Sequence, residues 1–153
     1  MRAVLCKELG MPDSLVVEEV PDLIAGAGQV LISVEACGVN FPDTLIIQGK
    51  YQFKPELPFS PGGEISGVIK QVGPDVDNLK IGDRVIAFST WGGFAEELVV
   101  DHTRTVTISD KMDYEKASAF VLTYGTSYHA LKDRAHLRKG ETLLVLGASG
   151  VLK

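Results

Sequence analysis

The chain has 153 residues, of which 45% are hydrophobic and 23% are charged, and its formal net charge at pH 7 is −5. These values are typical of a globular protein with one hydrophobic core, and no apolar stretch approaches the roughly 18 residues that a membrane span needs. The acidic balance, without runs of Lys or Arg between aromatic residues, argues against nucleic acid as a partner.

The first residues, MRAVLCKEL, lack the apolar core and the small-residue cleavage site of a secretory signal. We therefore expect a cytoplasmic protein that has no membrane partner. In a reducing compartment, Cys6 and Cys37 are expected to be small buried hydrophobic residues and not a disulfide.

Short β-type segments, separated by turns that contain Gly and Pro, follow one another to about Thr107. This pattern predicts a compact, mostly antiparallel barrel or sandwich. The predicted strands are Arg2–Lys7, Leu15–Val20, Gln29–Ala36, Glu64–Val72, Arg84–Phe88, Glu96–Val100 and Arg104–Ile108.

One short helix is predicted inside this β-rich part, at Phe41–Gln48. Asn40 is placed to cap its start, and Pro42 is tolerated in its first turn. Gly49 suits its C-terminal end.

After Ser109 the pattern changes to that of a longer helix. Apolar and aromatic residues recur at spacings of three and four, which predicts a helix with one buried face. Asp113 is placed to cap its start, and Gly125 inside it favours a kink or a close approach. The residues with this spacing are Ala117, Phe120, Val121, Tyr124, Tyr128 and Leu131.

The run Glu141–Leu146 is almost entirely apolar and predicts a strand buried on both faces of a parallel sheet. It leads into a glycine-rich turn that contains Gly147 and Gly150. A buried strand that enters such a turn begins a dinucleotide-binding unit, although two glycines alone also fit an ordinary loop. Because no further helix or strand follows before Lys153, we expect a truncated nucleotide-binding domain.

Several motifs occur in an order that is specific to one superfamily. They are Gly38–Val39–Asn40–Phe41–Pro42–Asp43, Gln48–Gly49–Lys50–Tyr51, Pro58–Phe59–Ser60–Pro61–Gly62–Gly63–Glu64, Lys80–Ile81–Gly82–Asp83–Arg84–Val85, Gly92–Gly93–Phe94–Ala95–Glu96 and Thr126–Ser127–Tyr128–His129–Ala130–Leu131. In these segments the chain resembles the medium-chain dehydrogenase/reductase superfamily, in particular its quinone oxidoreductase, or zeta-crystallin-like, branch.

The resemblance implies a mostly β fold with some α structure. Residues 1–125 would form a GroES-like, partly open β-barrel that carries the catalytic residues, either complete or without its C-terminal completing segment. Residues 126–153 would supply a linker helix and the first strand and Gly-rich turn of a truncated Rossmann domain.

Zinc is not expected. In zinc-dependent members of the superfamily two Cys and one His bind the catalytic metal, and a Ser or Thr relays protons. This chain has Asn40, Gly63 and Leu122 in the ligand positions and Pro42 in the relay position, and its two cysteines are too few for the family's structural zinc lobe. None of these side chains supplies the thiolate or imidazole that catalytic zinc needs.

A site without a metal has to stabilise charge by hydrogen bonds. Hydride transfer to a quinone or an enone leaves negative charge on the substrate oxygen, which donors stabilise and a proton neutralises. The resemblance implies that Asn40 and Thr126 face the nicotinamide of NADPH and that Tyr51 reaches the substrate or the nicotinamide. Asp43 is the third catalytic candidate, and Gly147 and Gly150 are candidates for the pyrophosphate.

Each candidate also has a structural alternative. Asn40 is also suited to a purely capping role, and Tyr51 to a packing role with its hydroxyl in water. For Asp43 we favour a structural role, either as a charge in the first turns of the short helix or as a group that orients Asn40. Glu64, which follows two glycines, is a candidate centre of a buried polar network.

Three functions remain open. The first is a zinc-independent, NADPH-dependent quinone or enone reductase, of which this chain is the front portion and whose intact form is a homodimer. The second is an enoyl-thioester reductase of the same superfamily. The third is a non-catalytic, truncated domain with a binding or structural role. Because most of the cofactor-binding residues would be missing, we expect the isolated chain to bind NADPH with a millimolar or weaker Kd.

Overall fold

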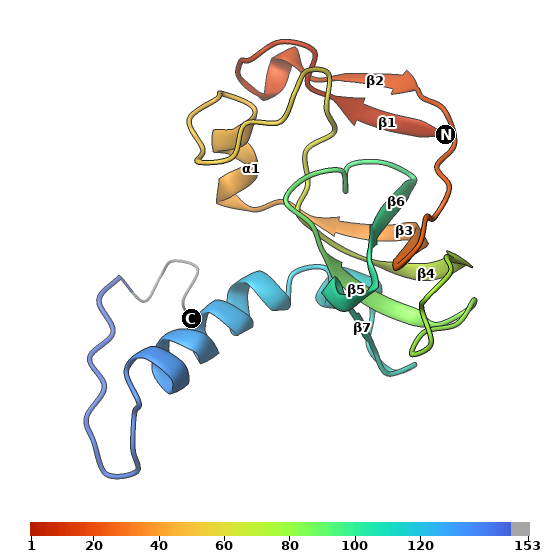
Figure 1. Ribbon diagram of the computed structural model, residues 1–153. Coiled ribbons are helices and arrows are strands. Elements are labelled where there is room, and N and C mark those ends of the chain that lie inside the picture. The colour runs from red at the N-terminus through yellow and green to blue at the C-terminus, as the bar shows by residue number, and fades with distance from the viewer. Residues whose placement is uncertain (148–153) are drawn as a thin grey trace.

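Two antiparallel sheets and a projecting helical segment make up the fold (Figure 1). The computed structural model describes residues 1–147. The small sheet pairs β1 (Arg2–Leu5) with β2 (Val16–Glu19), and the larger sheet has the strand order β6-β3-β4-β5-β7. Its strands are β3 (Gln29–Gly38), β4 (Glu64–Val72), β5 (Arg84–Phe88), β6 (Glu97–Asp101) and β7 (Thr105–Thr107). All seven predicted strands are present, β4 and β5 with their predicted bounds.

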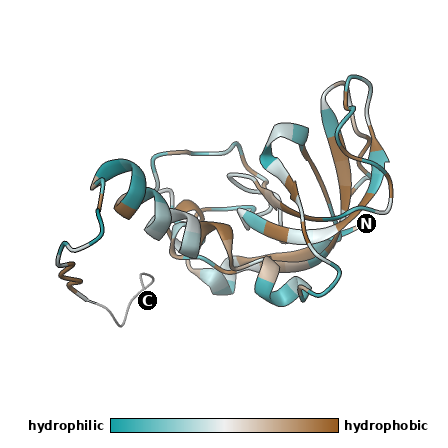
Figure 2. Cartoon of the chain, turned by 90° about the horizontal axis from the view of Figure 1, so that it is seen from below, coloured by the Kyte–Doolittle hydropathy of each residue, from teal (hydrophilic) through white to brown (hydrophobic). Residues whose placement is uncertain are grey.

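The core lies on one face of the larger sheet, because side chains along a strand alternate between its two faces. Val30 and Ile32 on β3 and Ile65 and Ile69 on β4 are almost fully buried there. Apolar stretches follow these strands (Figure 2). Outside the named strands, single bridges such as the one between Ala3 and Ala95 link the small sheet to the rest. The predicted mostly β fold, with a barrel that is not closed, is therefore confirmed.

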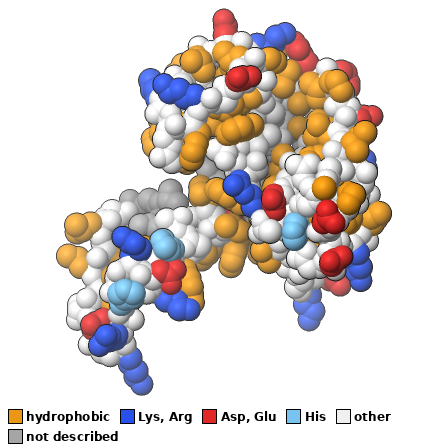
Figure 3. Space-filling model, viewed as in Figure 1, with side chains coloured by type: hydrophobic (Ala, Val, Ile, Leu, Met, Phe, Trp, Pro, Cys, Tyr) orange, Lys and Arg blue, Asp and Glu red, His pale blue; other side chains and the backbone are white. Residues whose placement is uncertain are grey.

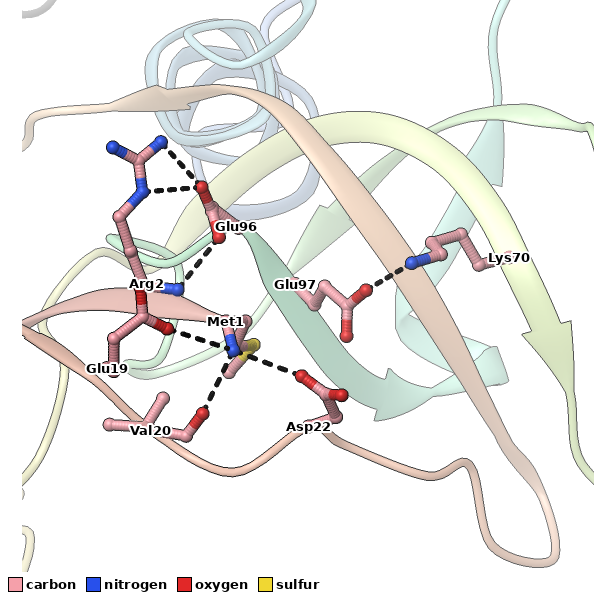
Figure 4. A network of polar contacts seen from close by, with 8 residues as sticks. All are labelled: Met1, Arg2, Glu19, Val20, Asp22, Lys70, Glu96 and Glu97. Atoms are coloured by element: carbon pink, nitrogen blue, oxygen red, sulfur yellow. Dashed lines mark hydrogen bonds and ion pairs between the residues drawn. The ribbon is translucent and has the colours of Figure 1, made fainter.

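Polar contacts at the chain's first residues connect the small sheet to neighbouring segments (Figure 4). The amine of Met1 donates to the Val20 carbonyl oxygen and to Oδ1 of Asp22, each at 3.0 Å. Arg2 forms an ion pair with Glu96 at 2.7 Å. Exposed ion pairs of this kind contribute little stability.

The short helix α1 (Phe41–Ile46) forms where it is predicted, with Asn40 at its N-cap position. Oδ2 of Asp43 accepts a hydrogen bond of 2.7 Å from the backbone N–H of Asn40. Gly49 has a φ of 67°, a left-handed conformation that favours glycine and ends the helical turn. The helix ends before Gln48, the predicted last residue.

The longer predicted helix is present as a helical segment, residues 114–134, that projects from the barrel (Figure 1). It contains α2 (Tyr114–Ala117), a wider π-helical stretch (Val121–Gly125), α3 (Thr126–Tyr128) and a second π-helical stretch (His129–Arg134). Asp113 lies at the N-cap position, but its carboxylate pairs with Lys116 at 2.6 Å and makes no capping hydrogen bond.

The prediction of one buried helix face is wrong beyond Ser118. Phe120, Tyr124 and Tyr128 are 45%, 58% and 59% exposed, because the segment projects from the barrel and no described residue buries these three side chains. Figure 3 shows hydrophobic side chains open to solvent where the helical segment leaves the barrel.

The predicted strand Glu141–Leu146 is also wrong, since these residues form neither strand nor helix. A strand needs a neighbour for its backbone hydrogen bonds, and none of the described strands lies beside this run. Leu144 and Leu146 are 78% and 83% exposed as a result. Gly147 lies in a turn with a φ of 71°, whereas Gly150 lies outside the described residues. Within residues 1–147, no helix has the length and apolar character to cross a membrane.

Candidate active site

A cavity of about 110 Å³ opens where α1, the start of β4, the end of β5 and the helical segment meet. It brings together all three catalytic candidates predicted from the sequence, Asn40, Asp43 and Tyr51. Thr126 is not in its wall, but lines an adjoining hollow that shares Phe88 and Leu122 with it. The cavity wall consists of Asn40, Pro42, Asp43, Tyr51, Phe53, Gly63, Phe88, Ser89, Thr90 and Leu122.

Asn40 lies between β3 and α1, close to the helical segment. Gly38 makes this approach possible, because a Cβ atom there would lie 2.3 Å from the carbonyl oxygen of Ser118. The amide Nδ2 of Asn40 donates to Oε2 of Glu64 at 3.3 Å. The side chain is therefore held by the barrel and also lines the cavity.

Asp43 is 6% exposed, and its carboxylate is engaged by the backbone N–H of Asn40. Burial raises the pKa of Asp43 above its ordinary value of 3.8, while hydrogen bonds from the backbone of Asn40 and Gly62 oppose the rise. This geometry supports the structural alternative, in which Asp43 orients Asn40.

Tyr51 is half-buried and packs against a small core cluster that contains Cys6 and Ile47. Its ring centroid lies 6.0 Å from that of Phe53, in a tilted arrangement. Within the described residues no hydrogen bond engages its hydroxyl, so the phenol is free to donate to a ligand.

Glu64 is the centre of a buried polar network, as the sequence suggests. It is 0% exposed, and one of its oxygens accepts from the backbone N–H groups of Val121 and Leu122, the latter at 3.0 Å. The other accepts from Asn40. The carboxyl group thus joins the barrel, α1 and the helical segment.

The three positions that correspond to zinc ligands in the resemblance converge on this cavity. Asn40, Gly63 and Leu122 all contribute to its wall, and so does Pro42 in the relay position. Side chains of this set contain no thiolate, imidazole or carboxylate, so they do not fit zinc. Elsewhere in residues 1–147, no three His, Cys, Asp or Glu residues gather as a metal site would require.

Sequence reasoning did not single out Phe53, Phe88, Ser89 and Thr90 as part of the site. Phe88 is the last residue of β5, and the alternation of buried and exposed side chains along that strand does not mark it as a site residue. These residues carry no metal-binding or acid–base signature, so only the folded backbone reveals that they surround the cavity.

The sequence of residues 26–110 matches the model of the alcohol dehydrogenase GroES-like domain. The chain belongs to this family. The resemblance to the quinone oxidoreductase branch of the medium-chain dehydrogenase/reductase superfamily is confirmed by this match together with curated relatives named as quinone oxidoreductases or quinone oxidoreductase-like proteins. The chain is 46% identical over 153 residues to quinone oxidoreductase-like protein 2 homolog of Nematostella vectensis, and the match covers 99% of the chain.

Solved structures agree in fold. The human synaptic vesicle membrane protein VAT-1 homolog-like protein matches 99% of the chain with a TM-score of 0.95 and 34% identity. The quinone oxidoreductase of Thermus thermophilus, solved also in complex with NADPH, matches 99% with a TM-score of 0.85 and 36% identity.

The matched part is a fraction of each of these proteins. The chain spans 41% of the Nematostella protein, 49% of the human chain and 47% of the Thermus chain.

Proposed function

We propose that this chain supplies the substrate-binding part of a zinc-independent, NADPH-dependent reductase of quinones or enones. The observation that carries the proposal is the convergence of Asn40, Tyr51, Gly63 and Leu122 on one cavity. Where the resemblance places the metal ligands of zinc-dependent relatives, the cavity has Asn40, Gly63 and Leu122, and the phenol of Tyr51 lies in the same wall. The curated relatives named as quinone oxidoreductases support the same reaction.

The nicotinamide end of NADPH suits this place. Leu122 and Phe88 offer apolar surface for a planar ring, and the amide of Asn40 and the hydroxyl of Thr126 offer hydrogen bonds to its carboxamide. When bound, the cofactor supplies a hydride. We assign Gly147 and Gly150 to the pyrophosphate, and the choice of NADPH follows the Thermus complex.

The chain's own residues would act on the substrate oxygen. Asn40 and Tyr51 are hydrogen-bond donors that stabilise the negative charge developing there, and the Tyr51 hydroxyl gives the proton that neutralises it. Phe53 and Phe88 exclude water from one side of the cavity, which strengthens these hydrogen bonds. Asp43 acts indirectly, because it holds the backbone of Asn40.

The proposal includes the division of the chain into a GroES-like part, residues 1–125, and a linker part, residues 126–153. A dimer of the whole protein and a cytoplasmic location stay predictions.

The proposal can be tested in a chimeric protein, called the joined protein below, in which this chain replaces the matching residues of the Thermus thermophilus quinone oxidoreductase. We expect the joined protein to consume NADPH when benzoquinone or an enone is added. A joined protein that folds but oxidises alcohols in a zinc-dependent manner, and reduces no quinone or enone, would overturn the proposal.

The same protein distinguishes the other two functions. Faster turnover of a crotonyl thioester than of any quinone would identify an enoyl-thioester reductase. Absence of all turnover in a folded joined protein that binds NADPH would favour a binding or structural role for this chain.

A further inference from the structure

Glu64 is the most deeply buried ionisable group beside the cavity, and it does not line the cavity wall. As the first residue of β4, it pairs with Gly38 on β3 and with Phe88 on β5. A buried carboxyl group is costly unless hydrogen bonds satisfy it, and here both of its oxygens are satisfied. Its cost to the fold is thereby offset, and its placement is rigid.

The partners of Glu64 come from two different elements. Oε1 accepts from the backbone N–H groups of Val121 and Leu122, where the helical segment begins its π-helical stretch. Oε2 accepts from Nδ2 of Asn40, just before α1. One side chain therefore sets the distance between the amide of Asn40 and the backbone of Leu122, and both of these residues line the cavity.

The contact also decides which end of the Asn40 amide faces the barrel. A primary amide has two N–H donors at one end and an acceptor oxygen at the other. Because the oxygens of Glu64 accept from their neighbours, the nitrogen end turns toward Glu64. Replacement of Oε2 by an NH₂ group would reverse this preference, since the amide oxygen of Asn40 would then be the better partner.

We propose that Glu64 is a positioning residue, which orients the Asn40 amide and fixes its distance from Leu122 without touching substrate or cofactor. The expected effect of Glu64 on catalysis rests on the proposed function. The orientation of the Asn40 amide does not rest on it, because that orientation can be measured in the chain itself.

The first test uses nuclear magnetic resonance on the full 153-residue chain. One side-chain N–H proton of Asn40 should exchange with solvent more slowly than the side-chain N–H protons of Asn78, an exposed asparagine whose Oδ1, not its Nδ2, is engaged. In Glu64→Gln this protection should be lost while the chain stays folded. Glu97→Gln, on β6, is the matched control and should leave the Asn40 resonances unchanged.

Equal exchange of the Asn40 and Asn78 side chains in the unaltered chain would overturn the inference, even if Glu64→Gln does not fold. Unchanged Asn40 resonances in a folded Glu64→Gln chain would overturn it as well.

The second test uses the joined protein. One of the two N–H groups of Asn40 donates to Glu64, and the other is left for the substrate oxygen. Because Glu64→Gln reverses the amide and displaces this second donor, it should lower kcat with the quinone by about tenfold or more and change KM by less than about twofold. A folded Glu64→Gln variant with unchanged kcat would refute the positioning role and leave the proposed function intact. If the unaltered joined protein is inactive, the proposed function fails, while the resonance experiment still decides how Asn40 is held.

Discussion

A Cβ atom on Gly63 would lie 2.8 Å from the carbonyl oxygen of Ser89. Contacts this short do not occur between real Cβ atoms and carbonyl oxygens, so the backbone has to move if any side chain is added. The resemblance aligns Gly63 with the histidine position of zinc-dependent members of the superfamily. The loop around Ser89 thus leaves no room for a larger side chain at this position.

Gly63→Ala should therefore destabilise the chain by about 1–3 kcal/mol, the usual cost of overpacking. Thermal unfolding followed by circular dichroism measures the effect. Gly125→Ala is the matched control, since its Cβ would lie 3.8 Å from the nearest atom, and it should raise stability by up to about 1 kcal/mol. Equal melting temperatures for the two variants would contradict the close approach of Ser89.

Asp43 should make stability depend on pH in a defined direction. Because burial raises its folded-state pKa above 3.8, the folded chain binds this proton more tightly than the unfolded chain. The contribution is fully present below pH 3.8 and is lost as pH rises through the folded-state pKa. Compared with Asp43→Asn, the unaltered chain should therefore lose unfolding free energy as pH rises through this window.

Urea unfolding at a series of pH values measures this difference. The exposed variant Asp13→Asn controls for the general effect of net charge. If the unfolding free energy of the unaltered chain instead increases relative to that of Asp43→Asn as pH rises, the predicted direction of the pH dependence is wrong.

Cys37 should be inert toward thiol reagents at neutral pH. Burial is the main cause that raises the pKa of its thiol from 9.0 to about 12, and the nearby Asp43 adds to the rise. Since the thiolate is the reactive form, the folded chain should react about a thousandfold more slowly at this residue than the unfolded chain. Iodoacetamide labelling followed by mass spectrometry, with Lys111→Cys as an exposed control, measures the ratio. Rapid labelling of native Cys37 would contradict this prediction.

Tyr51→Phe should separate proton donation from packing. The variant keeps the ring and its contact with Phe53, and loses only the hydroxyl. In the joined protein we expect kcat to fall by about 10²-fold, with KM nearly unchanged, because general acid catalysis contributes about this much. Phe53→Leu, which changes the ring that contacts Tyr51, is the control and should alter KM more than kcat. A Tyr51→Phe variant with full kcat would assign Tyr51 to packing alone.

Much of the barrel could be predicted from the sequence because its strands carry local signals. Glu64–Val72 and Arg84–Phe88 are rich in β-branched and apolar residues and are bounded by turns, and both have their predicted bounds. The helix after Asn40 is marked by its cap, by Pro42 and by Gly49 in the same local way.

The predictions that failed depend on partners distant in sequence. The run Glu141–Leu146 has the composition of a buried strand, but a strand exists only where another strand pairs with it. The spacing of Phe120, Tyr124 and Tyr128 indicates a helix, yet burial depends on what packs against it.

The candidate site could be predicted only in part, because some of its residues come from segments that are distant in sequence. Asn40, Asp43 and Tyr51 carry recognisable chemistry and lie close together in sequence, and the structure places all three on one cavity. Phe88 and Thr90 come from a distant strand and loop and have no such chemistry. Thr126, which the resemblance places near the nicotinamide, lines the adjoining hollow.

The proposed function requires this pocket to support hydride transfer without a metal ion. The most direct measurement is the rate of NADPH-dependent quinone reduction by the joined protein before and after exhaustive treatment with a zinc chelator, with zinc content determined in parallel. We expect an unchanged rate in a protein that contains no stoichiometric zinc. A rate that disappears with the chelator and returns when zinc is added would contradict the claim.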